Sequence, residues 1–185
     1  MGKFLMGVII GIVAFPVLLG LYFFTGRVPV GVADHAFFLE KFIAGGALYA
    51  QVNKEAPKRD LSSFTKEDLV AGAEVYRKSN CMECHGGPPQ FGQPVTHVLY
   101  PPAPLLFTSD GTVTDDPVGV SYWKVKNGIR LSGMPAYKDQ LTDEQMWQVA
   151  AVVASADKLP PGALEPLRPR ISSSVAPDAS RSPQK

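Results

Sequence analysis

Cys81-Met82-Glu83-Cys84-His85 contains both cysteines of the 185-residue chain. The pattern C-x-x-C-H is typical of covalent haem attachment, in which two thiols bond the porphyrin vinyl groups and the adjacent histidine ligates the iron. A disulfide framework would need more cysteines than these two. The motif therefore predicts one covalently bound haem c, attached through Cys81 and Cys84 and ligated by His85.

Two other uses of a C-x-x-C pair are weaker alternatives. A thioredoxin-like redox pair belongs to a βαβ arrangement, whereas the sequence around the motif predicts helices. A structural zinc site needs four Cys or His ligands close together, and the next histidine after His85 is the distant His97. The sequence favours haem attachment over both.

Three helices are expected around the motif. Their signals are capping boxes at the start, a proline at the first helical position, and a glycine after the last. The expected helices run from Thr65 to about Ser79 with Asp68 in a capping box, from Asp116-Pro117 to a stop at Gly128, and from Thr142, capped with Gln145, to Pro160-Pro161. The segments between them are rich in Gly and Pro and contain no convincing strand pattern. The sequence therefore predicts an all-α domain over residues 63–160.

The second axial iron ligand is expected to be Met134. It lies about fifty residues after His85, in a loop shaped by Gly133 and Pro135. Its thioether is a soft ligand suited to the sixth position of low-spin haem iron. A methionine that merely packs in the core is the alternative, and His97 is the rival ligand.

An apolar run precedes the domain. Residues 4–24 read FLMGVIIGIVAFPVLLGLYFF, without a charge. At about 1.5 Å per residue, a helix of this length matches a bilayer core of about 30 Å, and membrane helices tolerate a proline such as Pro16. A cleaved signal peptide, with Gly31-Val32-Ala33 as its cleavage site, is the main alternative, but its apolar region is usually only about 7–15 residues. We therefore expect residues 1–27 to form a transmembrane anchor.

Two further segments flank the domain. Residues 28–62 are expected to form an amphipathic segment and a linker, with a helix over 34–54 that can lie on the membrane surface, on a partner subunit or on the chain's own domain. Residues 161–185 contain Pro, Ser and Arg with few large apolar residues. Such a composition cannot offset the entropy of ordering, so we expect a disordered tail.

The chain resembles the class I c-type cytochromes, especially small monohaem members anchored to bacterial membranes. The resemblance covers residues 69–159, roughly half of the chain. Besides CMECH, it rests on features that occur in the family's order: Gly72 and Tyr76 on the helix before the motif, Trp123 to Gly128, Gly133-Met134-Pro135, and Trp147 in the last helix. A glycine at 72 lets its helix cross another closely, and Tyr76 one turn later lies on the same face.

The resemblance implies an electron carrier and not an enzyme. It also implies haem attachment outside the cytoplasm, hence a single-pass protein of the bacterial inner membrane with a cytoplasmic N-terminus and a periplasmic haem domain. Expected partners are redox proteins or subunits of a membrane complex, together with membrane lipid. The net charge of +1 gives no indication of nucleic acid binding. In the family a proline carbonyl orients the ligand histidine, and Pro101, Pro102 and Pro104 are all candidates.

Two other functions remain open. If Met134 binds weakly, an open iron would suit a gas sensor or a peroxidase-like enzyme. The other is a structural subunit in which the haem is incidental to assembly.

Overall fold

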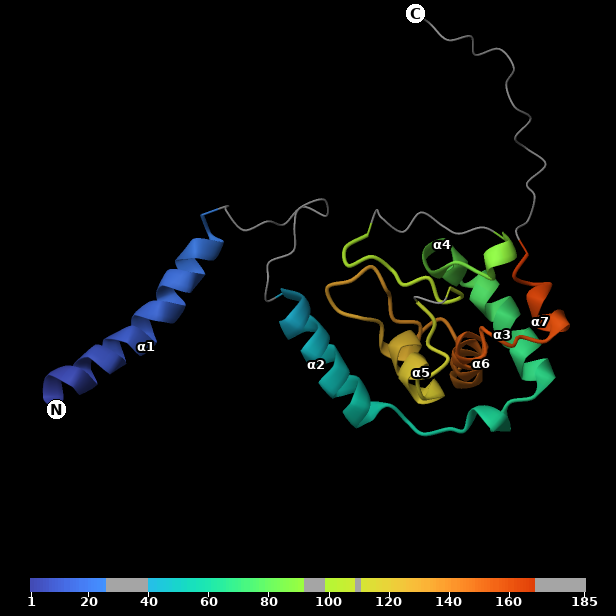
Figure 1. Cartoon of the computed structure of the whole chain (residues 1–185), viewed down its shortest axis with the longest axis horizontal. Coiled ribbons are helices and arrows are strands. Elements are labelled where there is room, and N and C mark those ends of the chain that lie inside the picture. Colours follow the sequence, from blue (N-terminus) through green and yellow to red (C-terminus); the bar gives the residue numbers. More distant parts are fainter. Residues whose placement is uncertain (26–39, 92–98, 109–110, 169–185) are drawn as a thin grey trace, which may run out of the picture. The chain divides into compact units, whose positions relative to one another are not determined.

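The computed structural model describes residues 1–25, 40–91, 99–108 and 111–168 (Figure 1). Every regular element in these ranges is helical, which confirms the expected all-α fold. The elements are α1 (Gly2–Phe23), α2 (Glu40–Glu55), the 3-10 turn η1 (Leu61–Ser63), α3 (Lys66–Lys78), α4 (Cys81–His85), the 3-10 turn η2 (Pro89–Phe91), α5 (Val118–Asn127), α6 (Asp143–Ala154) and α7 (Pro161–Leu164). The chain divides into two compact units, Met1–Tyr49 and Ala50–Lys185.

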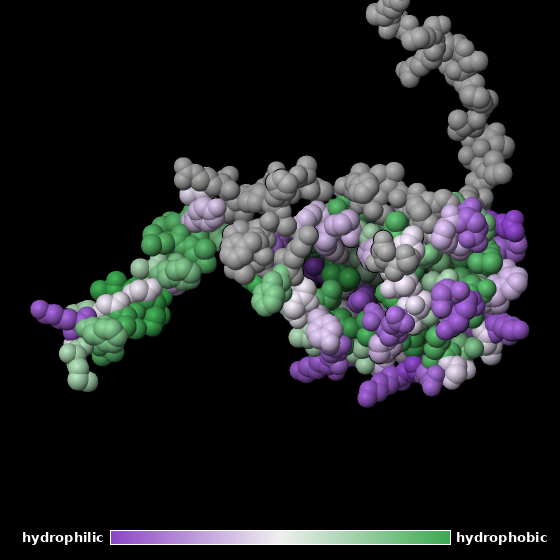
Figure 2. Space-filling model, in the orientation of Figure 1, coloured by the Kyte–Doolittle hydropathy of each residue, from purple (hydrophilic) through white to green (hydrophobic). Residues whose placement is uncertain are grey.

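Helix α1 contains no buried residue, and Pro16 lies inside it. Its surface is hydrophobic over most of its length (Figure 2). Among the described residues it is the one helix long and apolar enough to cross a membrane, by length and composition. This agrees with the span predicted for residues 4–24.

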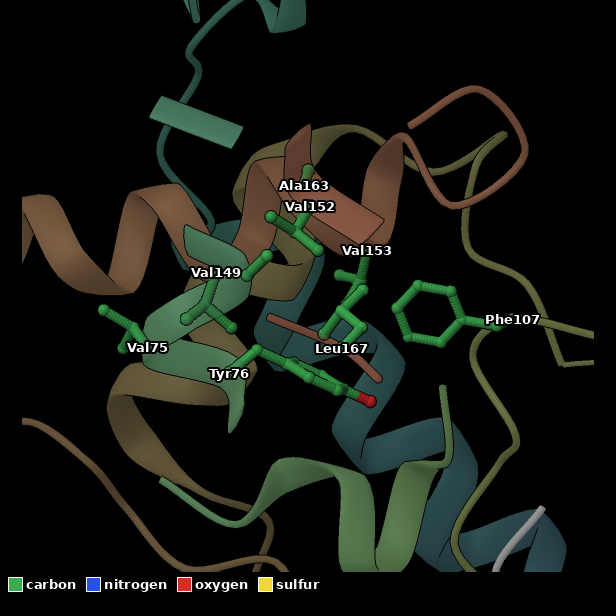
Figure 3. Packing of buried hydrophobic residues seen from close by; sticks show 9 residues of the cluster. Val75, Tyr76, Phe107, Val149, Val152, Val153, Ala163 and Leu167 are labelled. Carbon is green, nitrogen blue, oxygen red and sulfur yellow. The ribbon is translucent and has the colours of Figure 1, made fainter. Parts of the chain in front are cut away.

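The second unit is built around α6, whose eight residues from Met146 to Ala154 other than Gln148 are all buried. One side of α6 packs with α3, α7 and Phe107 in a core that includes Tyr76 and Leu167 (Figure 3). Its other side packs against Val118 and Tyr122 of α5, where the Tyr122 ring stacks on Trp147 with 4.0 Å between centroids. Because α6 has core on two sides, it is apolar around most of its circumference.

Gly72 is the point where α3 crosses α6. A Cβ atom placed on Gly72 would lie 2.6 Å from the backbone carbonyl carbon of Gln148 and 2.9 Å from a methyl group of Val152, with the Gln148 oxygen closer still. The two helices therefore approach more closely than any larger residue would permit. This confirms the close crossing expected from the sequence.

The expected capping boxes are present on α3 and α6. Thr65 and Asp68 exchange hydrogen bonds at the start of α3, and Thr142 and Gln145 do the same on α6. The start expected for α5 is wrong by one residue, because Pro117 has a ψ of 132° and serves as the N-cap, so that the helix begins at Val118.

The domain begins earlier than residue 63. Val52 on α2 is buried, and the Trp123 indole N–H donates to Glu55 over 3.0 Å. The Arg59 guanidinium, within the segment expected to be a linker, pairs with Glu144 at 3.3 Å and lies 4.1 Å above the ring of Phe64. The sequence of this segment is polar and contains proline, so it gave no indication that these side chains contact the core.

The disordered tail expected over 161–185 is wrong for residues 161–168. Pro161 stands in the first turn of α7, and Ala163 and Leu167 have no exposed surface. Two apolar side chains that fit the core completely are enough to order this short segment. Residues 169–185 lie outside the described ranges, as do His97 and most of the segment between α1 and α2.

Asp68 gives the fold a testable dependence on pH. The backbone N–H of Thr65 and the side chain of Gln148 hydrogen-bond this carboxylate and hold its pKa below the ordinary 3.8. A carboxyl with a depressed pKa stabilises the fold fully above its unfolded-state pKa, and this stability is lost as the pH falls through the folded-state value. We expect Asp68→Asn to destabilise the domain by less than about 1 kcal/mol at pH 7, since the group is only half-buried and its capping hydrogen bond is exposed to solvent.

The cost of Asp68→Asn should be smaller at about pH 3, below the ordinary pKa of 3.8, because part of the stability that the wild-type carboxylate contributes is lost there. Urea unfolding at both pH values measures this difference. Glu74→Gln on the same helix is the control, since Glu74 only pairs with Lys78 at the surface. A cost for Asp68→Asn that is equal at both pH values would contradict the prediction.

Candidate functional site

The CMECH motif forms its own short helix, α4, between two left-handed residues. Asn80 caps its start with a φ of 58°, and Gly86 follows its end with a φ of 70°. Asparagine and glycine are the residues that adopt this conformation most readily. The chain can therefore turn sharply out of α3 and place α4 directly after it. Cys81 and Cys84, three positions apart, share one side of this helix.

His85 is held by two hydrogen bonds from one loop. Its ring atom Nδ1 lies 2.9 Å from the carbonyl oxygen of Pro104, and its own carbonyl accepts from the backbone N–H of Leu106 at 3.1 Å. Since a carbonyl can only accept, Nδ1 carries the proton and Nε2 keeps its lone pair in the neutral ring. Burial lowers the pKa of His85 below its ordinary 6.5, which favours this neutral form.

Tyr76 connects the hydrophobic core to the motif. Its ring is 99% buried and meets Phe107 edge-on at 5.6 Å between centroids. Its hydroxyl donates to the carbonyl of Gly86 over 2.9 Å. The residue directly after His85 is thus fixed from the core side, and burial raises the pKa of the Tyr76 hydroxyl, so the phenol keeps its proton to donate.

The two cysteines are free thiols and partly buried. Burial raises the pKa of Cys81 to about 11, while a hydrogen bond with the Tyr137 side chain opposes this shift. The Tyr137 hydroxyl also reaches the carbonyl of Ser79 at 3.4 Å, and its backbone N–H donates to Val125 at 3.0 Å. Tyr137 therefore joins the segment after α5 to the motif.

Met134 lies three residues before Tyr137, in the loop between α5 and α6, and is partly buried. The loop is shaped by local bonds: the N–H of Met134 donates to the Ser132 hydroxyl at 3.1 Å, and its carbonyl accepts from Ile129 at 3.2 Å. At Gly128, which has a φ of 67°, any Cβ would collide with the backbone of the returning chain. The loop thus turns back at once, and Tyr137 brings its end beside Cys81.

The sulfur atoms of Met82 and Met146 have other surroundings. The Met82 thioether accepts from the Arg77 guanidinium at 3.4 Å, and its methyl group packs against Gly87. Met146 is buried beside α5 in the core on the other side of α6. Both methionines therefore already have packing partners in the fold.

A zinc site receives no support from the part of the chain that the structure describes. Within it, no group of three or more His, Cys, Asp or Glu side chains lies close enough to hold a metal ion. The donors that the CMECH motif itself supplies are two thiols and one histidine with a protonated Nδ1. This set fits a porphyrin with a metal at its centre, since the thiols can bond its periphery while Nε2 ligates the metal.

Two contributions to this site were not foreseen. Three prolines were equal candidates for the partner of His85, and the structure selects Pro104. The second is Tyr137, whose hydroxyl contacts both Ser79 and Cys81. Its position three residues after Met134 was the available signal, but a hydrogen bond to Ser79, 58 positions away, depends on the path of the loop.

Residues 67–151 match the family model described as cytochrome C oxidase, cbb3-type, subunit III. The matched range includes CMECH, Met134 and most of α3, α5 and α6. Comparison with curated proteins and with solved structures found no match.

Proposed function

Residues 67–151 form a c-type cytochrome domain, whose function is haem-based electron transfer, and from this premise we propose a membrane-anchored carrier of single electrons. In this proposal Cys81 and Cys84 hold one haem through thioether bonds, and His85 and Met134 are the axial ligands of its iron. A bound haem supplies a one-electron couple at the iron. The protein's residues attach it, orient it and limit access to it.

The observation that carries the proposal is the hydrogen bond between His85 Nδ1 and the Pro104 carbonyl. It fixes both the tautomer and the direction of the ring, so Nε2 is prepared to bind a metal before any metal arrives. The burial-lowered pKa of His85 acts in the same direction, because only the neutral ring can ligate. Cys81 and Cys84 then allow covalent attachment by adding each thiol across one vinyl group.

Electron transfer is favoured over gas sensing by the loop that carries Met134. Its turn at Gly128, its internal bonds and the Tyr137 contacts hold the loop close beside the motif. A thioether supplied by such a constrained loop would fill the sixth position and keep other ligands from the iron. A gas sensor or a peroxidase-like enzyme, with a ligand that leaves easily, remains the second candidate.

The location follows from combining α1 with covalent haem attachment. We place the chain in a bacterial inner membrane, with α1 as an uncleaved anchor, the N-terminus in the cytoplasm and the haem domain in the periplasm. The anchor would keep the domain at high local concentration near its redox partners. Those partners are soluble redox proteins if the chain is a shuttle, or neighbouring subunits if it belongs to a respiratory complex, as the description of the matched family suggests.

Replacing Met134 with alanine tests the ligand assignment. We expect the wild type to show the spectrum of haem c with a thioether-to-iron band and no response to carbon monoxide. Met134→Ala should lose the band and bind the gas, because the sixth position opens. Oxidised and reduced absorption spectra, recorded with and without carbon monoxide, measure both effects.

Met82→Leu is the matched control for this test. Its sulfur faces Arg77, so the variant should keep the wild-type spectrum. Ready binding of carbon monoxide by the wild type would instead move the sensor or enzyme function to first place. A purified protein without haem would refute the electron-carrier function altogether.

A further inference from the structure

Exposed apolar side chains gather on the first turns of α2. Apart from α1 and the residues at its two ends, Met1 and Phe24, the large hydrophobic residues that are exposed in the described ranges are Phe42, Ile43, Tyr49 and Leu131. Three of these four fall within eight consecutive positions of one helix, with 78% of Phe42, 61% of Ile43 and 72% of Tyr49 exposed. From residue 42 to residue 50 the sequence FIAGGALYA carries no charge. So many exposed apolar side chains close together on one helix of a folded protein indicate a surface that contacts a membrane or another protein.

The two ends of α2 have different surroundings. The last turns belong to the second compact unit, which begins at Ala50. There, Val52 is 97% buried, and the Glu55 carboxylate accepts a hydrogen bond from Trp123. In the first turns, by contrast, a Cβ atom added at Gly45 or Gly46 would meet nothing within 4 Å. Phe42, Gly46 and Tyr49 follow the spacing of one helical stripe. This stripe has open space around it along its length.

The covalent connection to α1 argues for a lipid surface as the occupant. Sixteen residues, 24–39, separate the end of α1 from the start of α2. Even fully extended, such a segment spans at most about 55 Å, so α2 can never be far from a bilayer that contains α1. A tether of this length keeps the local concentration of membrane surface high, and modest intrinsic affinity is then sufficient.

The residue types suit the boundary between headgroups and acyl chains. Aromatic residues such as tyrosine are enriched at that boundary, where an apolar ring and a polar hydroxyl are both accommodated. Helices that lie in the interface insert their aromatic and aliphatic side while the opposite side stays in water. At about 100° per residue, Gln51 lies on the side opposite to Phe42 and Tyr49. It is exposed and bonds to Glu55 along the helix.

We propose that the apolar stripe of α2 formed by Phe42, Gly46 and Tyr49, with Ile43 beside it, lies in the headgroup region of the bilayer that α1 spans. This inference rests on the proposed membrane anchor. The inference gives α2 two roles. Its first turns contact lipid, and its last turn is hydrogen-bonded to α5 of the cytochrome domain through Glu55 and Trp123.

Site-directed spin labelling of the full-length, haem-loaded protein tests this contact. Cys81 and Cys84 are consumed by haem, so single cysteines introduced as Phe42→Cys, Tyr49→Cys or Gln51→Cys can be labelled selectively. Each labelled protein is placed in nanodiscs of three parts phosphatidylcholine to one part phosphatidylglycerol. Collision rates with oxygen, which concentrates in lipid, and with a water-soluble nickel chelate are then compared. We expect the oxygen-to-nickel ratio to be several-fold higher at positions 42 and 49 than at 51.

Each other outcome overturns the proposal in a distinguishable way. If nickel reaches positions 42 and 49 as readily as 51, the stripe lies in water. If neither reagent reaches positions 42 and 49, a protein surface covers the stripe, either from a second copy or from another subunit. If the protein does not enter nanodiscs, the anchor assigned to α1 fails first, and the lipid contact fails with it.

Discussion

Replacing Gly72 with alanine will destabilise the cytochrome domain by about 3 kcal/mol, although alanine is the better helix former. The added methyl group would overlap the backbone of Gln148 and approach Val152 within 2.9 Å. A flexible side chain can move aside, but the carbonyl of an α6 residue cannot move without displacing that helix. Since α6 has core on two sides, the displacement disturbs the packing of α5 as well.

Urea unfolding followed by far-ultraviolet circular dichroism measures this effect as a lower midpoint. Gly45→Ala is the matched control, because it makes the same chemical change in α2, where the new methyl group meets nothing. This control should leave the midpoint unchanged or raise it slightly. A Gly72→Ala protein that unfolds at the wild-type urea concentration would show that α3 and α6 are not packed as closely as described.

The role of Gly72 also indicates how far the sequence could be interpreted. Its spacing from Tyr76 predicted a close crossing on one face of a helix, and the structure confirms it. The identity of the other helix at that crossing, with Gln148 and Val152 at the contact, was not predictable. Periodicity shows which side of a helix is buried, but the choice of partner depends on contacts between residues about 75 positions apart.

At the site, local features were predictable and the long-range partners were not. The cysteines and His85 form a contiguous motif, so their proximity follows from the sequence itself. The choice of Pro104 depends on the backbone of the loop, because three prolines close together offer similar carbonyl groups. The bond of Tyr137 to the chain beside Cys81 requires two segments to meet that no local pattern connects.

The error at the C-terminus has a different cause. The sequence after Pro160 is poor in large apolar residues, and Pro160-Pro161 was interpreted as the end of the ordered chain. In fact α6 ends earlier, at Ala154, and Pro161 lies in the first turn of α7. Proline is favoured there because its missing N–H would have no partner in any case. The average composition of the segment after Pro160 did not reveal that Ala163 and Leu167 pack into the hydrophobic core.

A chain that ends at Pro160 will therefore lose most of the domain's stability. Leu167 lies among Tyr76, Val153 and Phe107 and has no exposed surface (Figure 3). Truncating one buried leucine to alanine costs about 2–5 kcal/mol, and removal of residues 161–168 deletes Ala163 and the rest of α7 in addition. We expect a loss of about 5 kcal/mol or more, comparable to the whole stability of many domains.

The matched control is a chain that ends at Arg168. It keeps α7, Leu167 and the hydrogen bond from Arg77 to the Arg168 carbonyl, so its urea midpoint should equal that of the full chain. In the shorter chain the hydrogen bond from the Tyr76 hydroxyl to the Gly86 carbonyl should also weaken, because Leu167 packs in the same core as Tyr76. Its thioether-to-iron band should then weaken even without urea, although the haem stays covalently attached. Equal urea midpoints for the two truncated chains would contradict the prediction. They would mean that α7 and Leu167 do not contribute to the packing of the core.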